Sequence, residues 1–592
     1  MNLWIARIGG SSFSEPDIKK IDNFAADYKT LGRRDFFQFK TEQIHYVSFT
    51  ADREFGKKKY NSSGKELIAY SGLPVSKTTS FEDYRDVSNL EKFSSDVDKA
   101  MHELDGQFSI IRASENQFEC FTDFLGIHKV FYSELANGEL LVSNSVPCMQ
   151  LLKGVELNFD FYVNWIAFGG LYGYQTEDKN VHALPEFGHL KWTSSHGLKI
   201  DTLTDLSSLI LPDESLENYI DKTVTEFKNT IHYLSTFHKT VLPLSGGYDS
   251  RLVLEIFSLF DTSNLHCYTY PDNKEDVKFA KKVANYYNVQ HEVLEPKNQL
   301  KFEEINQSIF YPNDPFLCYS SIFGYQFRDQ RKKYYSEGLN VLLKGDGGDT
   351  PTGFKRYSFS NADHPERAVD YIVDRSVNSG LLLKDVELAY RNKMKNYYSD
   401  KYLELVEKSG ATYNFASIYY LLERFGNYQS HKLINGYQLN DMFLPYANEN
   451  FIKAVFSSPV RKLFKNKKES LHHMLHRKLL GNNAKAINFT GGVHWEANKL
   501  RRILHRVQKT VKSKMNHKET TYSSVIRDKF FEQNKTHFQE VIHSSGSCEL
   551  WNYFDFDQIN GALENDSMSS KQKKAIFRIV PFLKKRFEST QH

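Results

Sequence analysis

The chain has 592 residues, of which 40% are hydrophobic and 25% charged, an ordinary globular composition that argues against a disordered or fibrous protein. Its 76 basic and 73 acidic residues leave a formal net charge of +3, so overall charge offers no attraction to nucleic acid or anionic membranes. The five cysteines are scattered and odd in number, which argues against a disulfide framework or a zinc knuckle. No signal peptide or membrane-spanning run is found, and we expect a soluble, cytoplasmic protein.

The first part of the chain is predicted to be rich in β-structure, because short apolar runs alternate with turn residues. The clearest predicted strands are 108–112, 118–122, 130–132 and 140–142. A polar stretch follows and looks like a connector. We therefore expect a first domain over residues 1–200 and a linker over residues 201–218.

Strands and helices alternate after the linker, which predicts a parallel sheet with helical crossovers. The predicted helices are 219–237, 249–260 and 275–287, and the predicted strands are 240–244, 265–270 and 340–343. From residue 361 the helical pattern dominates. We expect a second domain over residues 219–500 and a basic helical extension over residues 501–592.

The extension carries two basic amphipathic stretches, 498–518 and 570–586. Such helices usually pack their apolar face and solvate their charges. Binding to a membrane surface, to nucleic acid or to an acidic substrate is the alternative.

The turn Ser245-Gly246-Gly247-Tyr248-Asp249-Ser250 lies between an apolar strand and an amphipathic helix, where an open α/β sheet binds its ligands. Its glycines allow close approach to an anion, and its hydroxyls and the helix N-terminus can donate hydrogen bonds. A carboxylate beside an anion site makes sense when a cation lies between them, so Asp249 is a candidate Mg²⁺ ligand. A simple helix-capping turn is the alternative.

A second loop, Lys344-Gly345-Asp346-Gly347-Gly348-Asp349, follows the predicted strand 340–343. Its glycines hold two carboxylates on a flexible backbone. Asp349 would complete a Mg²⁺ site with Asp249, which leaves Asp346 as a candidate general base. A solvated Asp-Gly turn is the alternative.

Together these loops resemble the asparagine synthetase family, whose pyrophosphate loop has the form SGGxDS and whose later loop has the form SGEGxDE. The helix start Glu275-Asp276 is similar to an acidic pair of the family, and the segment from Asp441 to Asn448 is similar to its EARVPFLD segment. Lys485, ahead of Trp495, resembles a family lysine. In the first half, Asp105-Gly106-Gln107-Phe108 is similar to DGMF, and residues 122–132 are similar to RDRLGIKPLYY.

The resemblance implies an α/β protein, with an N-terminal Ntn-hydrolase-like α-β-β-α sandwich followed by a parallel-sheet ATP-pyrophosphatase domain with a helical C-terminal part. It implies ATP and Mg²⁺ as cofactors. The nucleotide would be held by Leu242, Leu244, Ser245, Gly246, Gly247, Asp249, Ser250, Tyr270 and Gly345, and the metal by Asp249 and Asp349. Asp346, with Asp441, would deprotonate the amine, and Lys485 would stabilise charge developing on the acyl oxygen and the phosphate.

The chain departs from the family at several positions. Glutamine-dependent members use an N-terminal cysteine as nucleophile, whereas this sequence has Asn2 and no cysteine before Cys120, so we predict that glutamine is not hydrolysed. Phe443 and Asn448 replace the arginine and the closing aspartate of EARVPFLD, and Thr350-Pro351 replaces an acidic-apolar pair. These loops border the acceptor pocket in the family, and we therefore expect that free aspartate is not recognised in the standard manner.

Three functions stay open. The first is an ATP-dependent, AMP-forming carboxylate–amine ligase without glutamine hydrolysis, similar to β-lactam synthetases and lasso-peptide cyclases. The second is an ammonia-dependent asparagine synthetase, and the third is a non-catalytic nucleotide-binding homologue. The expected partners are a small-molecule or peptide carboxylate and an amine or ammonia. We expect no nucleic acid and no transmembrane segment, and a homodimer is allowed.

Overall fold

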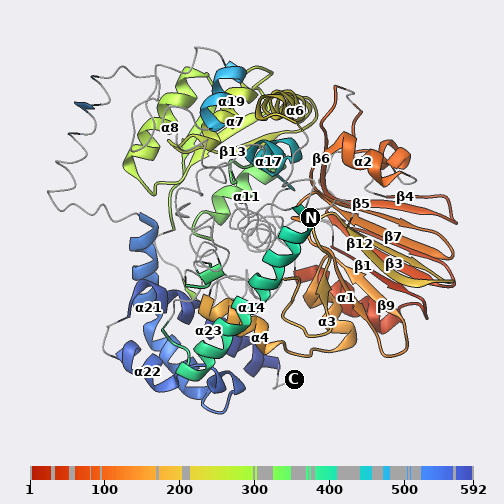
Figure 1. Ribbon diagram of the computed structural model, residues 1–592, viewed down its shortest axis with the longest axis vertical. Coiled ribbons are helices and arrows are strands. Elements are labelled where there is room, and N and C mark those ends of the chain that lie inside the picture. Colours follow the sequence, from red (N-terminus) through yellow and green to blue (C-terminus); the bar gives the residue numbers. More distant parts are fainter. Residues whose placement is uncertain are drawn as a thin grey trace.

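Two sheets lie face to face on one side of the molecule, a parallel sheet with its helices lies on another, and a group of C-terminal helices lies below it (Figure 1). The computed structural model describes residues 3–27, 34–51, 60–79, 82–93, 96–168, 173–202, 214–297, 301–302, 325–347, 369–370, 372–374, 380–409, 441–456, 471–480, 500, 503–504, 507, 522–564 and 568–589.

The face-to-face sheets are antiparallel, and their strands come from the first 202 residues. The first sheet has the order β10-β8-β9-β1-β3-β2 and the second the order β12-β11-β7-β6-β5-β4. The strands are β1 (Leu3–Ile8), β2 (Arg34–Lys40), β3 (Ile44–Ala51), β4 (Tyr60–Ser62), β5 (Leu67–Ser76), β6 (Leu104–Ala113), β7 (Gln117–Thr122), β8 (Phe131–Glu134), β9 (Leu140–Ser143), β10 (His182–Ala183), β11 (Gly188–Thr193) and β12 (Gly197–Thr202).

Strand β1 shows how these sheets form layers, because successive side chains of a strand point to opposite faces. Trp4 and Ala6 belong to the core between the two sheets. Leu3 and Ile5 belong to a separate core on the outer face of the first sheet, which α1 (Glu15–Asp27) and α3 (Val146–Lys153) cover. The first sheet is therefore apolar on both faces.

The outer face of the second sheet joins the core of the rest of the molecule. Ile68 and Tyr70 of β5 pack in one apolar cluster with residues of η2 (Val87–Phe93), α2 (Val97–Glu103) and α6 (Leu216–Phe237). This arrangement confirms the expected α-β-β-α sandwich. The sandwich and the parallel sheet therefore share one hydrophobic core where they meet.

The parallel sheet has the order β15-β14-β13-β16-β17, and every neighbouring pair in it is parallel. Its strands are β13 (Thr240–Pro243), β14 (Leu265–Thr269), β15 (Gln290–Val293), β16 (Val341–Leu343) and β17 (Asp441–Phe443). The helices around it include α6, α7 (Asp249–Phe257), α8 (Lys274–Tyr286), α11 (Arg328–Ser336), α17 (Glu449–Phe456) and α19 (Leu471–Leu480). The chain order reverses between β13 and β16, and such switch points are where open α/β sheets bind ligands.

The C-terminal helices form an apolar core of their own. They are α21 (Tyr522–Ser544), α22 (Phe556–Glu564) and α23 (Ser570–Ser589), and they pack with α4 (Phe159–Val163), with the π-helical turn η3 (Asn164–Phe168) and with residues near the start of α14 (Lys384–Ser409). Arg578 of α23 donates to the carbonyls of Trp165 at 2.9 Å and Ile166 at 3.1 Å. The second basic stretch thus packs its apolar face, whereas most of the first lies outside the described residues.

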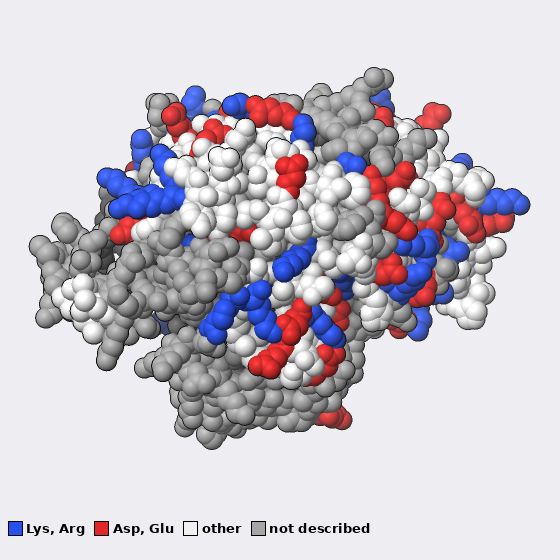
Figure 2. Space-filling model, turned by 90° about the horizontal axis from the view of Figure 1, so that it is seen from above, with Lys and Arg blue, Asp and Glu red and all other residues white. Residues whose placement is uncertain are grey.

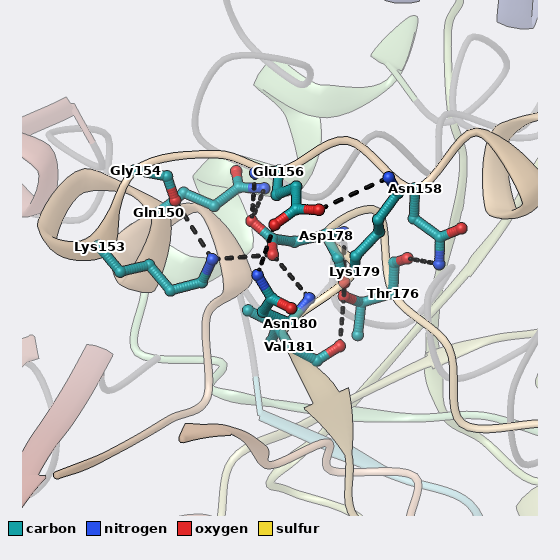
Figure 3. Close-up of polar contacts among 10 residues, drawn as sticks. All are labelled: Gln150, Lys153, Gly154, Glu156, Asn158, Thr176, Asp178, Lys179, Asn180 and Val181. Atoms are coloured by element: carbon teal, nitrogen blue, oxygen red, sulfur yellow. Dashed lines mark hydrogen bonds and ion pairs between the residues drawn. The ribbon is translucent and has the colours of Figure 1, made fainter. Parts of the chain in front are cut away.

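A buried ion pair anchors the segment on which α23 docks. Figure 3 shows the carboxylate of Asp178 pointing at Lys153, with Nζ and Oδ1 2.8 Å apart. The same carboxylate accepts from the backbone N–H groups of Glu156 at 3.2 Å and Asn180 at 3.0 Å. Asp178 therefore ties the end of α3 to both ends of the loop that carries α4 and η3.

Acidic and basic side chains are interspersed on the face seen from above in Figure 2, in keeping with the near-neutral net charge. Among the helices described, none is long and apolar enough to cross a membrane.

Candidate active site

The end of β13 is held firmly before the glycine-rich turn begins. The N–H of Leu244 donates to the Tyr268 carbonyl at 2.7 Å, and the Leu244 carbonyl accepts from the Thr269 hydroxyl at 2.7 Å. Leu242 pairs with Cys267 of β14 and is fully buried. Leu242 and Leu244, predicted nucleotide-binding positions, therefore lie in and at the end of a central strand, and β14 satisfies the backbone polar groups of Leu244.

The turn itself is closed by its two serines. Ser250 Oγ accepts from the Ser245 N–H at 3.0 Å and lies 3.1 Å from Ser245 Oγ. The Gly247 N–H in turn donates to Ser245 Oγ at 3.2 Å. These bonds curl residues 245–250 into a compact loop at the N-terminus of α7.

Helix α7 starts at Asp249, and no side chain caps it at Tyr248. The first N–H groups of a helix have no intrahelical partner, and the helix dipole adds partial positive charge there. A phosphate group is the type of ligand that satisfies both features. The local structure therefore supports the interpretation of residues 245–250 as an anion-binding loop.

The second loop lies directly against the first. A β-carbon at Gly345 would stand 2.6 Å from the Ser250 nitrogen, 2.9 Å from the Ser250 Cα and 3.0 Å from the Asp249 carbonyl carbon. Real β-carbons essentially never come within 3.0 Å of such atoms. Position 345 therefore needs glycine, and the loops after β13 and β16 meet at the switch point of the sheet.

Asp346 is half exposed next to this contact. Its carboxylate lies 3.3 Å from Lys344 Nζ, in an exposed ion pair. Asp346 thus stays accessible beside the loop contact, as a general base must be.

A further carboxylate reaches the loop from α8. Asp276 Oδ1 accepts from the Gly246 N–H at 3.1 Å. Asp276 belongs to the acidic pair noticed in the sequence, but it had no assigned role there. Its position beside the glycine-rich turn makes it a candidate metal ligand in addition to Asp249.

A buried cluster of charged residues lies behind the loop. Arg251 Nε donates to Glu255 Oε1 at 2.8 Å, and His476 Nδ1 lies 2.9 Å from Glu255 Oε2. All three residues are at most 2% exposed. Burial pushes the pKa of Glu255 upward, but His476 and Arg251 outweigh it and hold the pKa below its ordinary value. The cluster fixes α19 against the first turns of α7.

Tyr270 lies just beyond β14 among other aromatic side chains. Its hydroxyl lies 3.1 Å from that of Tyr268, and its ring packs on Phe327. Tyr268 also stacks on Tyr334, with ring planes 14° apart. Tyr270 thus stands at the carboxyl end of the sheet, next to the strand that leads into the glycine-rich turn.

The remaining predicted residues are not brought together by the described structure. Asp441 is buried at the start of β17, in register with Val341 at the amino end of β16, whereas Asp346 follows the carboxyl end of β16. This register does not favour Asp441 as the partner of Asp346. Asp349 and Lys485 lie outside the described residues, so their roles stay predictions. Among the residues described, no three His, Cys, Asp or Glu side chains gather as a metal site.

The strands and loops of the candidate site all lie in one region that matches the model of a known protein family. Residues 234–487 match the family model for asparagine synthase. This region is similar in sequence to asparagine synthase domains. It begins inside α6 and includes every strand of the parallel sheet, so the strands and both loops of the candidate site belong to it.

Two solved structures show weak similarity to this chain. One is glutamine phosphoribosylpyrophosphate amidotransferase from B. subtilis complexed with ADP and GMP, with 7% identity, coverage of 54% of this chain and 96% of that chain, and a TM-score of 0.24. The other is described as the allosteric regulatory enzyme of purine biosynthesis, with 9% identity, coverage of 58% and 74%, and a TM-score of 0.24. No curated protein matches. Such low similarity says nothing about activity.

The structure corrects one interpretation of the asparagine synthase domain. Phe443 and Asn448 were expected to reshape an acceptor pocket. Phe443 is instead fully buried in the shared core, and Asn448 donates to Asp105 of the sandwich at 2.9 Å and to Glu226 of α6 at 2.8 Å. Both substitutions adapt the domain interface.

Sequence reasoning missed the residues that support the loops. Tyr446 donates from its hydroxyl to the Asp249 carbonyl at 3.1 Å, and the cluster of Arg251, Glu255 and His476 lies beneath α7. The only sequence signal for this cluster is the Arg251–Glu255 spacing of four residues, which puts the two side chains on one helix face. The contact of Tyr446 with Asp249 and that of His476 with Glu255 join residues far apart in the sequence, so no local pattern predicts either contact.

Proposed function

We propose that the protein is an ATP-dependent, AMP-forming ligase that activates a carboxylate and joins it to an amine without hydrolysing glutamine. The observation that carries this proposal is the contact of Gly345 with Ser250, since it joins a candidate phosphate loop and a candidate general base in an asparagine synthase domain. The domain supports membership of an ATP-using ligase family.

The glycine-rich turn would bind the phosphates. The N–H groups of the first turn of α7 and the hydroxyls of Ser245 and Ser250 would donate to the pyrophosphate as it leaves the α-phosphorus. Gly246 and Gly247 carry no side chain that would keep a phosphate away from the backbone. Tyr270 and the backbone of Gly345 would flank the adenosine.

Mg²⁺ is a hard cation that prefers oxygen ligands, and carboxylates next to the phosphate loop are ligands of this kind. Asp249 and Asp276 would supply such oxygens, and Asp349 is the predicted third. Mg²⁺ would supply neutralising charge to the pyrophosphate when bound. Asp249 would also orient the loop, because it is the first residue of α7.

Asp346 would accept the proton of the attacking amine. The amine nitrogen attacks the acyl carbon of the acyl-adenylate, the C–O bond to AMP breaks, and the proton passes to the Asp346 carboxylate. Lys485 remains the predicted cation for the acyl oxygen and phosphate.

The cysteines of the sandwich support a nitrogen source other than glutamine. Cys120 and Cys148 are fully buried, and burial raises the pKa of both thiols. A buried, protonated thiol is a poor nucleophile. Neither residue is therefore a candidate nucleophile for glutamine hydrolysis.

Asparagine synthesis from aspartate and ammonia is the second candidate function. Three departures from the family favoured an acceptor other than free aspartate: Phe443, Asn448 and Thr350-Pro351. Phe443 is buried in the shared core and Asn448 binds Asp105 of the sandwich, whereas Thr350-Pro351 lies outside the described residues. The substitutions at 443 and 448 therefore leave the acceptor open.

The test is product analysis with purified protein, ATP, Mg²⁺ and a panel of carboxylates, with ammonium or glutamine as nitrogen source. We expect AMP and pyrophosphate in equal amounts with at least one carboxylate, supported by ammonium or by an amine within the substrate. Asparagine formation would select the second candidate. Release of ADP, or glutamate formation from glutamine, would contradict the proposal.

A further inference from the structure

One segment contacts both the sandwich and the pyrophosphate loop. This bridging segment, residues 441–448, comprises β17 and the 3-10 turn η8 (Pro445–Ala447). β17 is the edge strand of the parallel sheet, and it lies close to β5 and β6 of the sandwich. In Figure 1 the junction lies where β6 approaches α17, the helix that follows the segment.

Two side chains of β6 hold the bridging segment from the sandwich. Gln107 Oε1 accepts from the Leu444 N–H at 2.9 Å, and Asp105 Oδ2 accepts from Asn448 Nδ2 at 2.9 Å. Gln107 is 1% exposed and Asn448 is 1% exposed. Buried hydrogen bonds of this kind specify one geometry, because losing a partner leaves a polar group unsatisfied.

The residues at these contacts are those that depart from the family motifs. Gln107 stands where DGMF has methionine, which offers no comparable acceptor. Asn448 stands where EARVPFLD has aspartate, which as a carboxylate could only accept. Burial raises the pKa of Asp105, although Lys77 and Asn448 oppose the shift. A carboxylate at 448 would repel Asp105, whereas the Asn448 amide donates to it.

The other side of the bridging segment holds the pyrophosphate loop. Two residues beyond Leu444, the Tyr446 hydroxyl donates to the Asp249 carbonyl. Tyr446 is buried, and its ring packs edge-on against Phe227 and Phe451. The Tyr446 side chain is therefore fixed in one place, and so is the carbonyl that it holds.

We infer that Gln107 is a positioning residue for the nucleotide site, acting through the bridging segment to set the place of Asp249. The sandwich would then help to position the nucleotide site for the ligase reaction, without hydrolysing glutamine itself. The importance of Asp249 for nucleotide binding rests on the proposed function. The series of contacts from Gln107 through residues 441–448 to the loop does not depend on that proposal.

The experiment compares full-length wild type with Gln107→Met, Tyr446→Phe and the matched control Gln150→Met. Gln150 is also a buried amide of the sandwich, 7% exposed, but it lies on α3 and donates to Asp178. Two quantities are measured: amide hydrogen exchange of residues 245–250 without nucleotide, and the Kd for Mg-ATP by titration calorimetry.

We expect Gln107→Met and Tyr446→Phe to speed exchange at residues 245–250 and to raise the Kd about three- to tenfold, the range expected for losing one hydrogen bond. Gln150→Met should change neither quantity, even if it lowers the Tm equally. Unchanged exchange at residues 245–250 in Gln107→Met would overturn the inference, whatever the result for Tyr446→Phe. If wild type binds no Mg-ATP, the proposed function fails, and the exchange rates still decide the link.

Discussion

The backbone of Gly345 lies so close to that of Ser250 that a β-carbon at position 345 would stand 2.6 Å from the Ser250 nitrogen. Rigid backbone cannot yield as the end of a flexible side chain can. The contact therefore couples the loop after β16 to the loop after β13, and any side chain at 345 must push them apart.

We predict that Gly345→Ala weakens Mg-ATP binding at least about tenfold, or about 1.4 kcal/mol, because separating the loops misplaces the phosphate donors. Gly561→Ala is the matched control, since a β-carbon there meets nothing within 4 Å. Titration calorimetry measures both variants. Equal affinity of the two would show that the loop contact does not shape the site.

We predict that Glu255→Gln destabilises the protein by about 3 kcal/mol at neutral pH, because it leaves Arg251 buried without its carboxylate. The pKa of Glu255 is held below its ordinary 4.5 in the folded chain. Its charged form therefore adds stability that is present above pH 4.5 and lost as the pH falls through the folded-state pKa.

Urea unfolding of wild type and Glu255→Gln from about pH 7 to about pH 4 tests this sign. The difference in unfolding free energy should shrink toward acid pH. A difference that grows as the pH falls would mean that the carboxylate is protonated in the folded protein at neutral pH.

We predict that Asp178→Ala costs about 3–5 kcal/mol, because it leaves the buried Lys153 ammonium unpaired. Its carboxylate ties down the loop on which α23 docks, so hydrogen exchange should also rise in α4, in η3 and near Arg578. The control is Asp201→Ala, which removes an exposed pair with Lys199 and should cost less than about 1 kcal/mol. Equal losses in the two variants would refute the anchoring role.

We predict that Cys120, Cys148 and Cys267 resist alkylation in the native protein, because all three are fully buried and burial raises the pKa of each thiol. Iodoacetamide labelling followed by peptide mass spectrometry should show modification of these sites only after unfolding. Fast labelling of Cys120 or Cys148 in the native chain would reopen the question of a sandwich nucleophile.

The sequence predicted the elements whose apolar pattern is local. The helix expected over 219–237 is α6, Leu216–Phe237, and the strand expected over 240–244 is β13, Thr240–Pro243. It did not predict β15 and β17. β15 is mostly polar and β17 has only three residues, so each depends on pairing with a strand that comes earlier in the chain.

In the candidate site, too, the residues that carry sequence motifs were predicted, whereas the contacts between distant residues were not. Residues 245–250 and 345–346 carry motifs, and the structure brings the two loops together as their resemblance to one family implied. Gln107 and Leu444 are 337 positions apart, and neither residue alone has a pattern that points to the other. Contacts of this kind depend on how the whole chain packs, which no short window of sequence records.

Nucleotide binding at residues 245–250 can be measured without knowing the carboxylate substrate, by comparing Mg-ATP binding of wild type and Asp249→Ala. Asp22→Ala, at an exposed position on α1, is the control for the loss of one carboxylate. We predict that wild type and Asp22→Ala bind with the same affinity, and that Asp249→Ala binds at least about tenfold more weakly while its Tm is retained. Absence of binding by wild type, or equal binding by Asp249→Ala, would show that residues 245–250 do not form the nucleotide site.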